Sequence, residues 1–185
     1  MACLEIGSPQ LRNRATVVGN IVTASPANDT ISALVALNAS VLIESVGGER
    51  EVPIRKFFTG FRQTILAQSE LVRSIRIPRW NPQTVGTWFK IGNRTAQAIS
   101  VVHAGIVLEF DEATSLITKA DVAIGSVSET ISVSKSLSEY LVGKDLDAET
   151  SAAAARIVAS EISPIDDIRA TAAYRTSVTE TAIRR

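Results

Sequence analysis

Cysteine and histidine are nearly absent from this sequence. Cys3 is the only cysteine and His103 the only histidine among 185 residues. The chain therefore cannot form an internal disulfide, nor ligate zinc or an iron–sulfur cluster through a set of cysteines. A single histidine also excludes most metal sites and most nucleophile–base pairs built on histidine. We expect any demanding chemistry to come from a bound organic cofactor, and a reducing, cytoplasmic compartment to be the setting.

Long apolar runs and aromatic residues are also scarce. No apolar run approaches the length of a membrane span, and the N-terminal residues lack the pattern of a signal peptide. Aromatic residues make up 5% of the chain and the basic residues are scattered, so no nucleic-acid partner is expected. Residues 1–99 hold 11 basic and 6 acidic residues, whereas residues 100–185 hold 8 and 13. The basic half would attract phosphate groups or an acidic partner, unless the two halves are simply solvated faces.

The first half of the chain predicts a loop, a short helix and a small set of strands. Residues 6–20 are rich in turn formers and basic residues, and predict a loop. A helix over residues 30–37 follows, capped by Asn28 or Asp29. Three segments predict strands, the first two joined by a glycine turn: residues 41–45, 50–54 and 71–77. Val72 is out of phase with the alternation of the third strand, and three phenylalanines are expected in the core: Phe57, Phe58 and Phe61.

The second half begins after a polar linker at Trp80-Asn81-Pro82, which is the best candidate for a domain boundary. Alternation with a period of two predicts three strands: residues 87–91, 102–110 and 119–124. The middle strand is expected to be half-buried, and we interpret His103 on it as structural. Helical spacing then predicts three helices: residues 136–141, 148–162 and 167–183. Strands followed by helices indicate an α+β fold, with a small antiparallel sheet packed against helices.

The segment from Arg12 to Asp29 has the composition of a ligand-binding loop. Arg12 and Arg14 supply charge, and Gly19 lets the backbone approach a ligand closely. Short polar side chains accompany them: Thr16, Asn20, Thr23 and Ser25. Exposed N–H groups and hydroxyls without bulk suit a phosphate or a polar heterocycle. Composition alone also fits an ordinary turn, because a lone Gly-Asn pair is usually no more than that.

A series of local motifs closely resembles the flavin-carrying subunit of the molybdenum hydroxylases, the family of xanthine dehydrogenase and aerobic carbon monoxide dehydrogenase. The first is Thr16-Val-Val-Gly-Asn20 followed by Ala24-Ser-Pro-Ala-Asn-Asp29, which is similar to the second flavin loop of that subunit. The others follow in the same order as in the family: residues 57–64, 70–78, 89–94, 98–102 and 164–175. No single motif is decisive, but their shared order is specific and covers nearly the whole chain.

The resemblance implies a function and a domain plan. Residues 1–80 would be the second half of an FAD-binding domain of the PCMH type, a partial α+β subdomain, and residues 84–185 the C-terminal domain of the flavoprotein. FAD would relay electrons from an iron–sulfur partner to NAD⁺ or another acceptor. Substrate hydroxylation would take place at the molybdenum centre of a separate molybdopterin subunit. The chain itself would contribute neither catalytic side chains nor a metal site.

By the same resemblance, nine residues are expected to contact the cofactor: Thr16, Val17, Val18, Gly19, Asn20, Val22, Asp29, Val72 and Lys90. The backbone of residues 16–20 would lie against the pyrophosphate and flavin, with Val22 and Val72 near the ring. Asp29 would hydrogen-bond a polar part of the cofactor, and Lys90 would lie close to it. The alternatives are a bare helix cap for Asp29, an ordinary sheet position for Val72 and a solvated strand lysine for Lys90. Three other residues are interpreted as structural or interfacial: Arg62, Arg94 and Tyr174.

Two departures from the family pattern bear on these expectations. The family has paired glycines where this chain has Val18-Gly19, and a valine disfavours positive φ and adds bulk near a cofactor. The family's preceding glycine-rich subdomain also has no counterpart before Ile6. We therefore expect either an upstream chain that supplies that subdomain, or a truncated, non-catalytic remnant that acts as an interaction or structural module.

Overall fold

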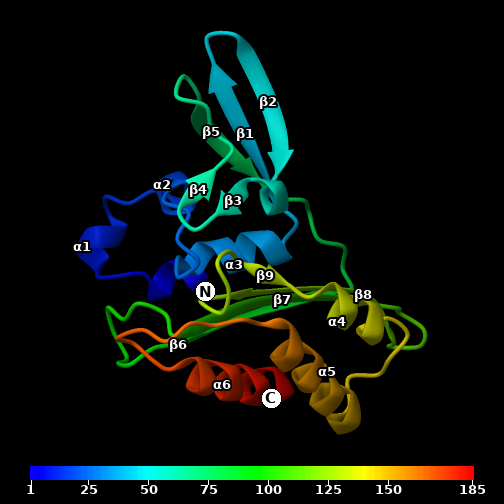
Figure 1. Cartoon of the computed structure of the whole chain (residues 1–185). Helices are drawn as coiled ribbons and strands as arrows, with labels where there is room; N and C mark the ends of the chain where they lie inside the picture. Colours follow the sequence, from blue (N-terminus) through cyan, green and yellow to red (C-terminus); the bar gives the residue numbers. More distant parts are fainter.

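A four-stranded antiparallel sheet lies at the centre of the protein in a computed structural model that describes residues 1–185 (Figure 1). Its strands follow one another in sequence order: β6 (Thr84–Ile91), β7 (Val102–Phe110), β8 (Ile117–Gly125) and β9 (Ser132–Val133). The register sets Trp88 opposite Gly105 and Lys90 opposite His103. Because cross-strand partners share a face and side chains alternate along a strand, these four residues lie on the same side of the sheet.

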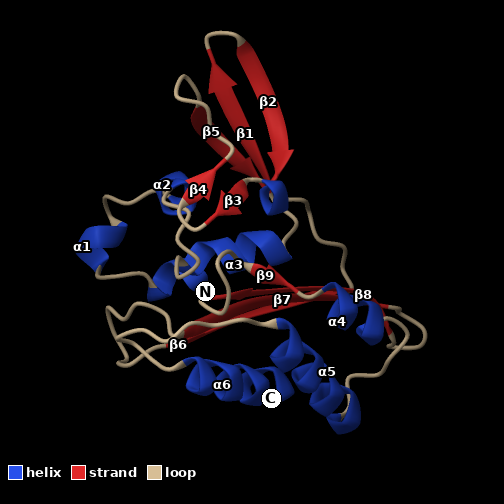
Figure 2. Cartoon of the chain, in the orientation of Figure 1, coloured by secondary structure: helices blue, strands red, loops and turns tan.

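Helices cover both faces of this sheet (Figure 2). Helix α3 (Asp29–Ala36) packs on one face against β7 and β8. The other face is covered by α4 (Lys135–Leu141), α5 (Ala148–Glu161) and α6 (Ala172–Arg184). The prediction of a half-buried β7 was therefore wrong, since Val107 contributes to the core under α3 and Leu108 to the core under the C-terminal helices. Alternating apolar residues could not reveal that a second layer covers the other face.

A second, three-stranded sheet projects from the body of the molecule beyond α3 (Figure 1). Its order is β2 (Gly48–Pro53), β1 (Ser40–Ser45) and β5 (Leu71–Arg76), which confirms the predicted hairpin. A bulge explains why Val72 is out of phase: Ile43 pairs with Val72 while the adjacent Leu42 pairs with Ser74. The bulge turns Val72 into the core and leaves Leu71 exposed.

The segment between β2 and β5 contains two short strands that were not predicted, β3 (Phe58–Gly60) and β4 (Gln63–Thr64). The aromatic cluster there is only partly in the core. Phe57 is fully buried and Phe58 partly so in the core under α3 (the first core), whereas Phe61 is 55% exposed and does not belong to it. The prediction that all three phenylalanines are buried was therefore wrong for Phe61.

The predicted loop over residues 6–20 contains two short helical segments. A 3-10 turn (Ala2–Glu5) precedes two short helices, α1 (Pro9–Arg12) and α2 (Val17–Val22). Ser8 accepts a hydrogen bond from the Leu11 N–H, and Thr16 caps α2 in the same way. A serine before a proline at the first helical position is a known start signal, and the turn-forming composition concealed it.

The C-terminal helices begin at their caps. Asp147 Oδ1 accepts the Thr150 N–H at 2.7 Å, as expected for the start of α5. The final helix begins at Ala172 with Thr171 as its cap, not at residue 167, because residues 167–170 form a turn closed by a β-bridge. Its buried face is centred on Arg175, while Tyr174 is 52% exposed. None of the helices is both long and apolar enough to span a membrane.

Candidate functional site

The first turn of α2 presents the predicted Thr16–Asn20 segment at the surface. Thr16, Val17 and Gly19 are exposed, and Thr16 Oγ1 accepts the Gly19 N–H at 2.9 Å. Helix geometry leaves the first N–H groups of a helix without intrahelical partners, so the Val17 and Val18 amides are free to bind an anion or water. The segment thus combines a hydroxyl, main-chain donors and little bulk.

Val18 does not strain this turn. Neither Val18 nor Gly19 has a positive φ, because both lie within α2. The side chain of Val18 is half-buried and packs against the first core. The expectation that a valine here would oppose the backbone conformation was therefore wrong, since that objection applies only to a left-handed turn.

Asn20 connects α2 to the start of α3. Its side-chain oxygen accepts a hydrogen bond from the Thr30 hydroxyl, and its main-chain carbonyl accepts one from Asn28 Nδ2 at 2.6 Å. Val22, one turn away from Val18, is exposed. Helix α2 also packs against β5, the strand that carries Val72. Val72 itself is 8% exposed and belongs to the first core, so it occupies an interior sheet position next to α2.

Asp29 and Lys90 form a buried ion pair. Lys90 Nζ lies 2.6 Å from Asp29 Oδ2, and the two side chains are 7% and 8% exposed. The Ser100 hydroxyl donates to Asp29 Oδ1, and Lys90 Nζ also donates to the main-chain carbonyl of Glu5 at 3.0 Å. Lys90 is therefore not a solvated strand lysine. Asp29 is not a cap either, because α3 begins at it and its carboxylate bonds to the sheet and the following loop.

The local structure explains why these two groups meet. Lys90 lies on the face of β6 that looks towards α3, and Asp29 is the first residue of that helix. A carboxylate at a helix N-terminus is favoured by the helix dipole. Two predicted site residues that are 61 positions apart thus form one contact, which joins the two halves of the chain.

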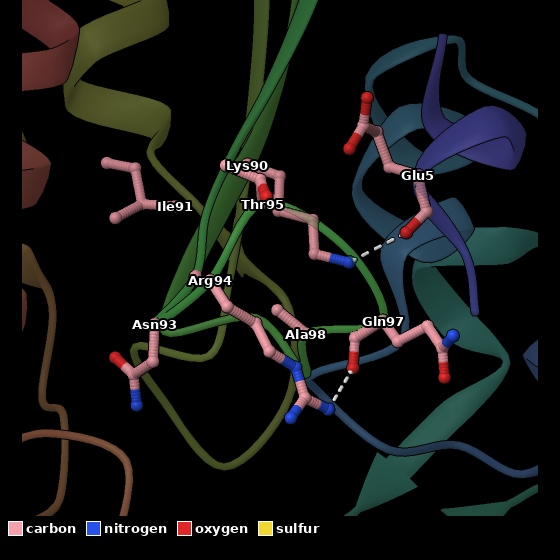
Figure 3. A pocket seen from close by; sticks show the side chains of 9 residues that line it. Glu5, Lys90, Ile91, Asn93, Arg94, Thr95, Gln97 and Ala98 are labelled. Atoms are coloured by element: carbon pink, nitrogen blue, oxygen red, sulfur yellow. Dashed lines mark hydrogen bonds between the residues drawn. The ribbon is translucent and has the colours of Figure 1, made fainter. Parts of the chain in front are cut away.

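Three adjoining cavities run along this junction. The largest, of about 570 Å³, lies between α2 and the loops that follow β3 and β6, and Asn20 and Asp29 line it. A smaller cavity of about 150 Å³ lies beside Thr16 and Val17 and shares Asn20 with the first. The third, of about 410 Å³, is lined by Lys90 and by residues 91–98 (Figure 3). The predicted residues 16, 17, 20, 29 and 90 therefore line three neighbouring cavities (together, the groove), of which the largest shares lining residues with each of the other two.

The loop after β6 closes one side of this groove. Figure 3 shows Arg94 turned back on its own loop, where it donates to the main-chain carbonyls of Ala96 and Gln97 at 3.0 and 2.7 Å. Asn93 Nδ2 donates to the carbonyl of Arg169 at 3.0 Å, which ties this loop to the segment before α6. These contacts agree with the interpretation of Arg94 as structural.

The sequence did not single out an arginine–aspartate cluster behind the groove. Arg175 is fully buried and donates to the Val101 and Ser126 carbonyls at 2.7 and 3.0 Å and to Asp167 at 2.7 Å. Arg169 pairs with the same carboxylate. These contacts, with the Arg169 hydrogen bond the largest, hold the pKa of Asp167 well below its usual range. The adjacent Asp and Arg residues in 164–175 are the signal in the sequence that could have indicated this cluster.

Comparison with known proteins accounts for both halves of the chain. Residues 1–80 match the family described as the FAD binding domain in molybdopterin dehydrogenase. Residues 87–185 match the CO dehydrogenase flavoprotein C-terminal domain family. The chain therefore belongs to the flavoprotein family of the molybdenum hydroxylases, which confirms the resemblance carried by the sequence motifs.

Individual relatives support the same assignment. The chain is 34% identical to the nicotinate dehydrogenase FAD-subunit of Eubacterium barkeri, over 80% of this chain and 51% of that protein. It is 28% identical to the carbon monoxide dehydrogenase medium chain of Hydrogenophaga pseudoflava, over 97% and 62%. The solved structure of carbon monoxide dehydrogenase from that organism superposes with a TM-score of 0.91 at 27% identity, covering 98% of this chain and 62% of that one. The α+β fold class is thereby confirmed, and the chain spans about half to three fifths of these relatives.

Proposed function

We propose that this chain is the C-terminal part of an FAD-binding subunit of a cytoplasmic molybdenum hydroxylase. Residues 1–80 would act as the second half of the FAD-binding domain and residues 84–185 as its C-terminal domain. The observation that carries the proposal is the groove formed by the three neighbouring cavities, lined by Thr16, Val17, Asn20, Asp29 and Lys90. The family matches over residues 1–80 and 87–185 support the assignment of the chain to such a subunit.

The donor set of the groove fits the chemistry of FAD. A pyrophosphate needs main-chain N–H groups and hydroxyls without competing carboxylates, and the first turn of α2 offers these at Thr16, Val17 and Val18. Gly19 and Asn20 would complete the contact, with Val22 exposed beside them and Val72 behind α2. When bound, FAD would supply the redox chemistry, which the side chains of this protein lack.

The Asp29–Lys90 pair would hold the two walls of the site in one arrangement. Each charge is buried and satisfied by the other, so neither side chain needs the cofactor to stay in place. The remaining lone pairs of the Asp29 carboxylate would accept hydrogen bonds from hydroxyls of the cofactor. Lys90 would hold the Glu5 carbonyl, and with it the N-terminal turn, against the sheet.

The rest of the complex follows from the family. An iron–sulfur subunit would deliver electrons to the flavin, a molybdopterin subunit would oxidise the substrate, and NAD⁺ or another acceptor would take the electrons. A second possibility is that the chain acts as a structural or interaction module, since the Asp29–Lys90 pair is complete without a cofactor.

Flavin retention tests this proposal. The chain would be purified alone and after co-expression with the iron–sulfur and molybdopterin subunits of its complex, mixed with FAD and desalted. We expect flavin absorbance to be retained in the co-expressed preparation. Retention by neither preparation, together with no FAD-dependent thermal shift, would contradict flavin binding and leave the structural or interaction module as the better account.

A matched pair of variants locates the binding segment. V17D adds a negative charge to the first turn of α2, where it would repel the pyrophosphate while remaining favourable for the helix. V46D adds the same charge in the β1–β2 turn, where Val46 is fully exposed and far from the groove. We expect V17D to lose flavin and V46D to retain it. Equal retention by both would place the cofactor elsewhere.

A further inference from the structure

His103 lies at the centre of a buried chain of hydrogen bonds between the sheet and α3. Its Nδ1 lies 2.7 Å from Ser32 Oγ, and its Nε2 lies 3.0 Å from the main-chain carbonyl oxygen of Pro26. Trp88 Nε1 donates to the same serine oxygen at 3.1 Å. The imidazole is fully buried, so none of these bonds is shared with solvent.

Only one arrangement of protons satisfies every group in this chain. A carbonyl oxygen cannot donate, so Nε2 must carry the proton that faces Pro26. In the neutral imidazole Nδ1 is then an acceptor, and the Ser32 hydroxyl must donate to it. The remaining lone pairs of Ser32 receive the Trp88 N–H. The geometry therefore fixes His103 as the neutral Nε2–H tautomer.

The surrounding backbone is shaped to keep the ring in this place. Gly125 lies opposite His103 on β8, and a Cβ there would come within 1.9 Å of Nε2. Only a glycine leaves room for the imidazole to reach Pro26. The Ser126 N–H donates to the same Pro26 carbonyl at 2.9 Å. One carbonyl therefore receives two donors, one from β7 and one from the residue that follows β8.

The carbonyl so held belongs to the wall of the large cavity. Residues 25–29 line that cavity between the end of α2 and the start of α3. Ala24, just before them, has a φ of 51°, a conformation that an alanine adopts only under external restraint. The Pro26 carbonyl attaches this segment to the central sheet, because it accepts hydrogen bonds from both His103 and Ser126.

We propose that His103 is a positioning residue, which acts through the Pro26 carbonyl to hold the cavity wall of residues 24–28 in the shape that the cofactor requires. The relation to the cofactor rests on the proposed function, whereas the hydrogen bond from His103 to the Pro26 carbonyl does not. The imidazole does not touch the cofactor cavity itself. Its role is to fix the segment before Asp29 at a set distance from the sheet.

The surroundings of the ring favour its neutral form. Burial lowers the pKa of His103, and the Pro26 carbonyl opposes this shift only in part. The charged groups that face it are Asp29 at the start of α3 and Lys90 on β6, which act in opposite directions. A second proton on Nδ1 would also take away the acceptor to which the Ser32 hydroxyl donates, so that the Ser32 oxygen would face N–H donors from both His103 and Trp88.

The single histidine makes the first test direct. In the ¹⁵N-labelled full chain without FAD, the only imidazole signals belong to His103. We expect the nitrogen shifts of the Nε2–H tautomer, unchanged between about pH 5 and 8, the range in which a free histidine titrates. An Nδ1–H tautomer, or titration with an ordinary midpoint, would overturn the proposal whether or not the chain binds FAD.

Two variants of His103 then test whether its hydrogen bond to Pro26 matters, or only the volume of its side chain. The amide nitrogen of H103Q can occupy the place of Nε2 and donate to Pro26, whereas the shorter H103N can reach only Ser32. In the preparation that retains flavin, we expect H103N to bind FAD about tenfold more weakly, as for the loss of one hydrogen bond to the wall. H103Q should rescue most of this loss.

The outcomes are distinguishable from failure of the proposed function. Equal FAD affinity for H103N, H103Q and the unchanged protein would overturn the positioning role. If H103N does not fold, a tenfold loss in H103Q would overturn it equally, since that variant keeps the Pro26 bond. If the unchanged protein binds no FAD, the rate of amide hydrogen exchange of residues 24–28 still tests the hydrogen bond to Pro26. Faster exchange in H103N than in H103Q supports its role in holding this segment, and equal exchange overturns it.

Discussion

The two faces of the central sheet are held in different ways. On the α3 face, buried polar groups join helix and sheet: Asp29 with Lys90, and Ser32 with His103 and Trp88. Beyond the end of α3, the more exposed Asn38 and Arg55 contact Asp121 on β8. On the opposite face, α4, α5 and the sheet meet mainly through apolar side chains such as Leu137 and Val158. The polar contacts there lie at the margins, where Ser134 and Ser136 donate to Glu161 and Arg175 lies next to the candidate site.

This difference shows where the relative position of helix and sheet must be fixed precisely. Apolar contact is non-directional and allows small shifts of one layer over another. A hydrogen-bonded ion pair fixes distance and direction, and an unpaired member is costly when buried. The polar contacts lie on the face where α3 forms part of the groove, which is where a shift of an ångström would alter the site.

The largest expected effect comes from breaking the buried ion pair. K90M leaves the Asp29 carboxylate buried without its partner, so we expect the free energy of unfolding to fall by about 3–5 kcal/mol in urea denaturation. The double variant D29N/K90M removes both charges and should recover most of this loss. A loss below about 1 kcal/mol for K90M would show that the pair does not hold the two halves together.

A smaller effect is expected on the apolar face. Leu137 on α4 is fully buried, and L137A should lower the free energy of unfolding by about 2–4 kcal/mol through lost burial and a cavity. The imidazole signals of His103 should nevertheless stay as they are, because Leu137 belongs to the apolar core on the opposite face of the sheet from the ring. A change of tautomer in L137A would contradict the independence of the two faces.

Helix α3 packs closely against the sheet at Gly105. A Cβ at Gly105 would lie 2.8 Å from the main-chain oxygen of Ser32, so G105A must displace the helix. We expect a loss of about 1–3 kcal/mol, as for overpacking of a core, together with altered imidazole signals of His103. An unchanged NMR spectrum would mean that Ser32 can move without affecting the ring.

The smallest effect is expected in the projecting three-stranded sheet. Glu70 accepts from Arg50 Nε and Nη2 at 2.7 and 2.8 Å and from the Ala67 N–H at 2.9 Å, and these bonds lower its pKa from 4.5 to about 2. A lowered folded-state pKa contributes stability that is present above pH 4.5 and is lost as the pH falls towards 2. The stability difference between the protein and E70Q should shrink over that window. A stability difference between the two proteins that does not change with pH would contradict the lowering of the Glu70 pKa by Arg50.

Prediction from the sequence succeeded where a pattern is local and regular. The strands at 102–110 and 119–124 and the helix after Asp147 have long periodic patterns, and the structure confirms them. It failed for α1 and α2, whose few residues carry turn-like composition, and for strands of two or three residues. In α6 no apolar pattern could reveal the most buried position, because the buried residue is an arginine whose charge is matched by Asp167.

For the candidate site, the family resemblance drew attention to the residues that line the groove, and the scarcity of cysteine and histidine limited the metal chemistry this chain can hold. Only the tertiary structure decided that Lys90 is paired with Asp29 and that His103 binds the carbonyl of Pro26, across separations of 61 and 77 residues. The physical reason is that periodicity and capping act over a few residues. Contacts across such separations depend on strand register and on the layer that covers each face.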